Sequence, residues 1–443
     1  MLVLRSRRMI LPEGERPAAL HIDAGVIARI AAYDSDDPTG AALFDAGHLA
    51  VSPGLVDTHV HVNEPGRTAW EGFDTATRAA AAGGVTTIVD MPLNSVPATT
   101  DVAALGAKRE AARAQSHVDV AFWGGVVPGN AGELDALVDA GVRGFKCFLV
   151  PSGVDEFPAV DEDDLRQALP VVARRQVPLL VHAELPGLLT VAADAPRHNY
   201  RTYAATRPCA AEAEAIRLMV RLAEEFGARV HIVHVSSAEG VSVIAAAKAK
   251  GIPVSAETCP HYLTFTGDEI ADGATEFKCA PPIRSAADRD ALWQGLFDGT
   301  LDLVATDHSP APPAMKRGDG TGDFFAAWGG IASLELSLAA VWSRLRNFGG
   351  TLSTLARWMS EAPAALAGFG DRKGRIAPGF DADLVVWDPD GNVHVDPLRL
   401  QQRHKLTPYA GRTLAGRVEA TFVGGQRVWD RGRLTRAYGG RLL

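Results

Sequence analysis

Cysteine is scarce in this sequence, and no two cysteines lie close together along the chain. Cys147, Cys209, Cys259 and Cys279 are far apart, and none belongs to a Cys-x-x-Cys motif. This spacing argues against a disulfide framework and against a cysteine-based structural zinc site. Reduced thiols in a cytoplasmic protein are the expectation.

Long apolar runs and basic clusters are also missing. No stretch approaches the roughly 20 uncharged residues of a membrane span, and residues 1–10 lack the apolar core of a signal peptide. The 44 Lys and Arg residues are outnumbered by 53 Asp and Glu residues, a net charge of −9, and no basic stripe carries interleaved aromatic residues. We therefore expect a soluble, cytoplasmic protein with neither a membrane nor a nucleic acid as partner.

What the chain does contain is a regular alternation of apolar runs and helix-length segments. The strand candidates are residues 54–62, 85–91, 118–126, 142–150, 177–182, 229–235, 253–258 and 301–306, and the clearest helix candidates are residues 70–82, 102–114, 210–226 and 237–250. Eight strand–helix units predict an α/β fold, a closed (β/α)8 TIM-like barrel over residues 53–373. An open doubly wound sheet is the alternative, but no Gly-x-Gly-x-x-Gly loop follows the first strand.

Both ends of the chain carry short apolar runs separated by Gly, Pro and Asp. They are residues 1–4, 19–22, 26–31 and 41–44 at the start, and 382–387, 417–423 and 426–429 at the end. Neither set is large enough to form a stable sheet alone. We predict that residues 1–52 and 374–443 fold together into one small β-sandwich domain.

Two histidines end the first barrel strand. His59 and His61 follow the apolar run 49–56, and because alternate side chains of a strand share a face, both imidazoles point the same way. Neutral imidazole is a common zinc ligand, so this pair predicts half of a metal site. The alternative is one packed and one solvated histidine.

Other strand ends supply further metal-competent side chains, because barrel active sites form at the carboxyl ends of the strands. His182 ends the fifth strand, although a buried core histidine is the alternative. His234 ends the sixth, and His231 is interpreted as structural. Asp307 is favoured over His308 because a hydrolytic water needs a carboxylate as proton acceptor.

Lys146 lies inside the buried fourth strand. An unpaired buried ammonium is costly, so the amine needs a partner or must lose its charge. One reading is a buried salt bridge. The other is a carbamate formed with carbon dioxide, whose two oxygens would bridge two divalent metals about 3.5 to 4 Å apart.

These motifs together resemble the amidohydrolase superfamily, in its branch of cyclic amidases. The resemblance spans nearly the whole chain, through residues 53–61, 144–148, 256–263, 305–310 and 373–384. Within the branch the chain is most similar to the allantoinase family, through residues 63–73, 91–95, 145–148, 328–331 and 404–409.

The resemblance implies a binuclear metal site. Its ligands would be His59, His61, Lys146, His182, His234 and Asp307, with Lys146 as N6-carboxylysine and Asp307 also as the catalytic proton shuttle. A metal-bridging hydroxide would open the ring of a small cyclic ureide, allantoin, to give allantoate. Two divalent metals per chain are implied, zinc, cobalt, manganese or iron, with no organic cofactor. A homo-oligomer, a tetramer by analogy, is also implied.

Related activities remain open as alternatives. Hydantoinases and dihydropyrimidinases place a tyrosine shortly after the carboxylated lysine, which residues 147–152 lack. Dihydroorotases usually carry an arginine where this chain has Asn63. A non-catalytic scaffold is a further alternative, although no metal ligand is missing.

Substrate contacts are expected from Asn94, the backbone around Cys279, and Ser309, which would hydrogen-bond the imide face of the ring. A turn or helix cap before Pro310 is the alternative for Ser309. His261 is a candidate pocket residue. The glycine-rich segment 318–323 is a candidate lid.

Overall fold

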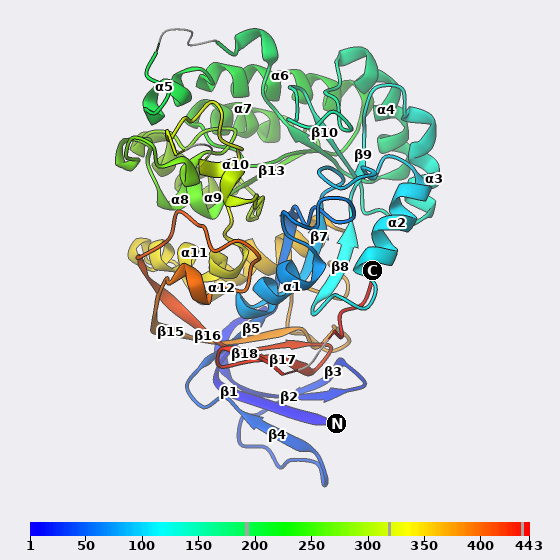
Figure 1. Cartoon of the computed structure of the whole chain (residues 1–443). Helices are drawn as coiled ribbons and strands as arrows, with labels where there is room; N and C mark the ends of the chain where they lie inside the picture. Colours follow the sequence, from blue (N-terminus) through cyan, green and yellow to red (C-terminus); the bar gives the residue numbers. More distant parts are fainter. Residues whose placement is uncertain (191–194, 318–319, 436–437) are drawn as a thin grey trace.

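The computed structural model describes residues 1–190, 195–317, 320–435 and 438–443. A barrel of strands and helices stands on a separate sheet to which both ends of the chain contribute, and the C-terminus lies beside a barrel strand (Figure 1). In the described part of the chain, no helix has the length and apolar character needed to cross a membrane.

The barrel strands are all parallel and form two hydrogen-bonded groups. One group is β6 (Leu55–Val60), β7 (Val85–Asp90) and β8 (Asp119–Phe122); the other is β9 (Gly124–Gly125), β10 (Phe145–Phe148), β11 (Leu179–His182), β12 (Val230–Ile232), β13 (Val254–Thr258) and β14 (Leu303–Val304). Their apolar side chains are almost completely buried, as in a sheet covered by helices on one face and by barrel core on the other.

Two junctions join these groups into a closed ring. The predicted third strand is divided at Trp123, where pairing changes from β7 to β10: the Trp123 amide donates to Asp90 O (3.0 Å) and the Gly124 amide to Gly144 O (2.9 Å). On the other side, the His61 amide donates to His308 O (2.8 Å). The predicted α/β barrel is confirmed.

Helices follow the barrel strands and cover them (Figure 1). They include α1 (Phe73–Ala82), α2 (Val102–Ala112), α3 (Leu134–Asp139), α4 (Glu162–Arg175), α5 (Tyr200–Ala205), α6 (Cys209–Phe226), α7 (Ala238–Ala249), α8 (Pro260–Thr264), α9 (Ala286–Asp298), α10 (Pro313–Arg317), α11 (Ser337–Leu345), α12 (Leu352–Ala356) and α13 (Ala362–Leu366). Local signals set their ends: Asp101, Ser237 and Ser285 accept amide hydrogen bonds at the starts of α2, α7 and α9.

The terminal strands form one nine-stranded sheet. They are β1 (Leu2–Leu11), β2 (Gly14–Asp23), β3 (Val26–Ala31), β4 (Ala42–Asp45), β5 (Ala50–Pro53), β15 (Leu384–His394), β16 (Thr413–Val423), β17 (Gln426–Asp430) and β18 (Arg433–Leu434). The two ends of the chain meet where β5 pairs antiparallel with β15.

The terminal sheet encloses a hydrophobic core of its own. Phe44 of β4 and Phe422 of β16 pack with ring centroids 5.1 Å apart, so the N-terminal and C-terminal halves of the sheet face each other, as predicted for a sandwich. The boundaries of the two domains, residues 1–52 with 374–443 and residues 53–373, stay predictions.

Candidate metal centre

Five of the six predicted metal ligands lie at or just beyond the carboxyl ends of barrel strands, and Lys146 is the second residue of its strand. His59 belongs to β6, Lys146 to β10 and His182 to β11, while His61, His234 and Asp307 follow β6, β12 and β14 within three residues. All six side chains are buried. Strands distant in the sequence therefore bring these groups to one end of the barrel.

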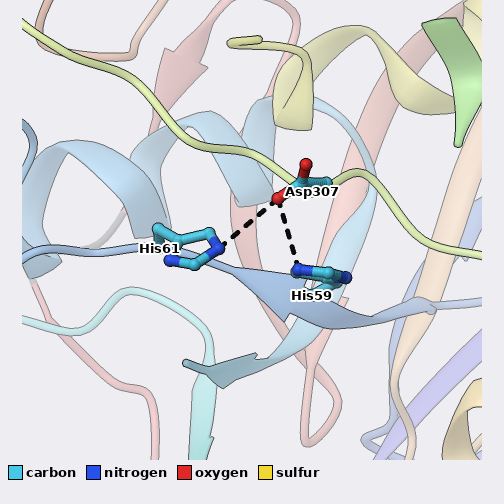
Figure 2. A group of neighbouring side chains, drawn as sticks. All are labelled: His59, His61 and Asp307. Carbon is cyan, nitrogen blue, oxygen red and sulfur yellow. Dashed lines mark ion pairs between the residues drawn. The ribbon is translucent and has the colours of Figure 1, made fainter. Parts of the chain in front are cut away.

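Three of these side chains point toward one another (Figure 2). The Nε2 atoms of His59 and His61 lie 3.2 and 3.4 Å from Oδ1 of Asp307. Burial opposes ionisation of Asp307, but the two imidazoles outweigh it and hold the pKa of this carboxyl far below its usual value. Two imidazoles and an ionised carboxylate within 4.8 Å of one another are a donor set suited to a divalent metal.

A carboxylate orients His59 from behind. Nδ1 of His59 lies 2.5 Å from Oε1 of Glu257, and Oε2 of Glu257 lies 3.1 Å from Nε2 of His231. The chain of contacts continues from His231 Nδ1 to the hydroxyl of Ser255 (2.8 Å). Nδ1–H of His59 thus has an acceptor, which leaves Nε2 free toward Asp307, the tautomer that a metal requires. His231 contacts Glu257 and does not line the cavity.

His182 and His234 form the other side of the cluster. Their ring centroids are 4.7 Å apart, and Phe148 stacks on His182 at 4.7 Å. Glu184 accepts from His182 Nε2 (2.7 Å) and pairs with Arg207 (2.5 Å), which leaves Nδ1 of His182 available. Burial lowers the pKa of both imidazoles, which favours the neutral form that a metal ligand needs.

Lys146 forms no ion pair with any residue that the structure describes. Its side chain is completely buried, and Nζ has no hydrogen-bond acceptor among the described residues. Burial lowers the pKa of this amine to about 8, which makes its neutral, nucleophilic form accessible. Nδ1 of His234 is likewise buried without a partner. Since buried polar atoms are normally paired, these two atoms fit a centre that external ligands complete.

Four non-glycine residues around this cluster have left-handed backbone: Asn63 (φ 66°), Asn94 (φ 68°), His234 (φ 41°) and Asp307 (φ 45°). This region is sparsely populated for side-chain-bearing residues and clusters at functional sites. Each of the four follows a barrel strand, so the unusual backbone occurs where the chain leaves a strand and carries a polar side chain.

A cavity of about 600 Å³ opens onto the cluster, the size expected for a small-molecule site. Asn94 and Ser309 line it; Asn94 Nδ2 is 3.5 Å from His61 Nδ1, and the Ser309 hydroxyl donates to Asp307 O (2.8 Å). Cys279 lies between two lining residues, and its carbonyl accepts from Tyr203 (2.7 Å). Their substrate roles stay predictions.

The remaining candidates lie elsewhere. Nδ1 of His308 accepts from the amides of Ser333 (3.2 Å) and Leu334 (3.3 Å). The His308 ring is therefore directed to this backbone segment rather than to His59 and His61. His261 is buried but is not among the residues that line the cavity. Residues 318 and 319 of the candidate lid lie outside the described residues.

Sequence reasoning missed the carboxylates behind the imidazoles. Glu184 lies two residues after His182, and this same-face spacing was a usable signal. Glu257 is separated from His59 by 198 positions and meets it only through the barrel. Lys278, which lines the cavity, was also missed.

Buried imidazoles, a lysine and a carboxylate at the strand ends of a (β/α)8 barrel define a barrel hydrolase that uses divalent metal. The sequence matches the family described as "Amidohydrolase family" over residues 50–428. The chain belongs to this family, which confirms the resemblance and the prediction of a hydrolytic enzyme.

Individual relatives are similar over their full length. A protein named allantoinase from Streptomyces avermitilis is 52% identical, with 100% of this chain and 98% of the relative covered, and one from Arabidopsis thaliana is 42% identical over 97% and 88%. Among solved structures, an L-hydantoinase (dihydropyrimidinase) from Arthrobacter aurescens superposes with a TM-score of 0.93 at 33% identity, covering 100% of this chain and 99% of that one.

Proposed function

We propose that the protein hydrolyses the cyclic amide bond of allantoin to give allantoate. The observation that carries this proposal is the convergence of three buried strand-end ligands, His59, His61 and Asp307, on one small-molecule cavity. The names of the full-length relatives support the substrate, a small cyclic ureide.

The metal ligands in this proposal are the six strand-end side chains. They are His59, His61, Lys146 as a carbamate, His182, His234 and Asp307. The unpartnered buried atoms of Lys146 and His234 and the nearby neutral imidazoles fit two divalent ions, with zinc, cobalt, manganese and iron all suited to these donors. When bound, such ions supply polarisation of the ring carbonyl and a lowered pKa of water.

Asp307 moves the proton. Its ionised carboxylate accepts a proton from the attacking water and delivers it to the ring nitrogen that leaves. Asn94, Ser309 and the backbone at Cys279 bind the imide face of the ring. Glu257 and Glu184 fix the orientation of the His59 and His182 rings, so these rings need little reorientation during the reaction.

Turnover of allantoin by the purified protein, before and after chelation and metal return, tests the proposal. We expect activity to disappear with the metal and to return with about two ions per chain. Two bound ions without allantoin turnover would overturn the substrate assignment, and turnover that survives complete metal removal would overturn the mechanism.

Hydrolysis of other hydantoins is the second candidate function. The observation that favours it is the TM-score of 0.93 to a hydantoinase. Substituted hydantoins and dihydrouracil, assayed beside allantoin, separate the two. The homotetramer and the cytoplasmic location remain predictions. Light scattering tests the first, and cell fractionation tests the second.

A further inference from the structure

Three described residues that line the cavity are basic, and one of them differs from the others. Arg197 Nε forms an ion pair with Asp323 (2.6 Å), and Arg207 Nη2 forms one with Glu184 (2.5 Å). These two charges are neutralised by carboxylates. Lys278 forms no ion pair with any described carboxylate.

Among the described residues, the Lys278 ammonium is held by uncharged acceptors. Nζ donates to the backbone carbonyls of Phe325 (3.3 Å) and Ala327, and it lies 5.3 Å from the ring centroid of Tyr203. An ammonium has three hydrogens to donate, so one remains. Because Lys278 is half-buried and has no carboxylate partner among the described residues, this donor can meet an acceptor brought by a ligand.

The wall around Lys278 is rigidly tied together. The carbonyl of Lys278 accepts from the Gly330 amide (2.9 Å) and from Nζ of Lys316 (2.9 Å), and the same Lys316 amine donates to the Trp328 carbonyl (3.0 Å). The segments 278–280 and 325–330 therefore form one unit. A donor on such a support keeps a fixed position, which a specificity contact requires.

The cavity has two chemically different walls. The strand ends present imidazoles and a carboxylate, where the proposed chemistry acts on the ring. The other lining residues come largely from loops and include Lys278, Phe325 and Trp328. A substrate with a polar group beyond its ring can meet both walls.

We propose that Lys278 is a specificity-determining residue, whose remaining ammonium hydrogen donates to the carbonyl oxygen of the ureido side chain of the substrate. This inference rests on the proposed function. The ureido carbonyl is the acceptor that unsubstituted hydantoin and dihydrouracil lack. A charge-assisted hydrogen bond to it would favour ureido-substituted rings over plain ones.

The substitution Lys278→Met in the full-length, metal-loaded enzyme tests the inference. We expect kcat/KM for allantoin to fall about 10²-fold, because a lost hydrogen bond to a buried group discriminates strongly. We expect the value for unsubstituted hydantoin and the metal content to remain at the level of the unsubstituted enzyme. Where hydantoin turnover is too slow, its inhibition constant against allantoin serves as the readout.

Lys316→Met is the matched control, since it removes a buried lysine amine from the same wall but not from the cavity lining. Because it loosens the support of Lys278 without removing the Lys278 ammonium, its selective loss of kcat/KM for allantoin should be smaller than that of Lys278→Met. If Lys278→Met does not fold, Lys278→Gln is used in its place, because the Gln side chain still donates to the wall carbonyls.

Equal losses for allantoin and hydantoin in the Lys278 variant would overturn the inference, and so would the same selective loss in Lys316→Met. Both results leave allantoin turnover by the unsubstituted enzyme intact. Absence of that turnover would instead overturn the proposed function.

Discussion

Two buried lysines, one at each end of the barrel, differ in how many partners their amines have. Lys146, at the carboxyl ends of the strands, has no hydrogen-bond partner among the described residues. Lys373, beside the terminal sheet, contacts Asp383, Asp119 (2.8 Å) and Asp381 (3.3 Å). Breaking a paired buried charge destabilises the fold, whereas the unpaired amine of Lys146 is available to a ligand.

The paired cluster even resembles a metal site in shape. Oxygens of Asp119, Asp381 and Asp383 lie within 4.8 Å of one another. Lys373 and Arg441 fill it, however, and although burial disfavours the charge on Lys373, these carboxylates outweigh it and raise the pKa of the amine. The cluster links β8, the β15 end of the terminal sheet and the C-terminal segment.

Removing the paired lysine is expected to cost the most stability. Lys373→Met leaves Asp383 buried without its cation, while Asp119 keeps only Arg441 (2.6 Å), and breaking a buried pair in this way costs about 3 to 5 kcal/mol. Denaturant unfolding measures this loss, while turnover per folded molecule should be unchanged. The control is Arg372→Met, whose partly exposed pair with Asp381 (2.9 Å) is worth at most about 1 kcal/mol. Equal stability of the two variants would contradict the distinction.

Removing the unpaired lysine is expected to cost activity instead. Lys146→Ala should lower kcat/KM for allantoin about 10²- to 10³-fold, comparable to losing one essential electrostatic group, together with the metal content. Its unfolding midpoint should not fall as that of Lys373→Met does. Added short-chain carboxylates should restore part of the activity. Full metal content and an unaltered rate would remove the carbamate from the mechanism.

The carboxylate behind His59 sharpens the comparison, because it is paired and yet serves the metal end. Glu257→Gln keeps the size of the side chain but weakens the acceptor for His59 and His231. Metal affinity should fall about 10- to 100-fold, as measured by competition with a chelator. Ser255→Ala, one contact further away, is the control and should have little effect. Unchanged affinity in Glu257→Gln would argue that Glu257 serves packing alone.

Glu335 is a partly buried carboxylate outside both clusters. Burial raises its pKa from 4.5 to about 7, although it accepts from the Gln401 amide (2.6 Å). Because the folded state binds this proton more tightly than the unfolded state, its contribution to stability is lost as pH rises from about 4.5 to 7. Glu335→Gln should therefore gain stability relative to the unsubstituted protein between pH 5 and 8, on the order of 1 to 3 kcal/mol. A difference independent of pH would contradict this assignment.

The periodicity of the chain was enough to predict the barrel strands, since apolar runs and strand-end positions are local features. It was not enough to place the division at Trp123, because that division follows from a change of neighbour, from β7 to β10. The preference for Asp307 over His308 was based on chemistry. In the structure the Asp307 carboxylate faces His59 and His61.

The sequence by itself determined the class of fold, the meeting of the two termini, the family and the residue types at the strand ends. These follow from periodicity and from short motifs whose residues are neighbours in the chain. Only the tertiary structure decided that Glu257 orients His59, which buried lysine is paired, and that Lys278 lines the cavity without an ion pair to any described carboxylate. The physical reason is that these pairings and their desolvation depend on groups brought together from strands far apart in the sequence, as with His59 and Glu257, 198 positions apart.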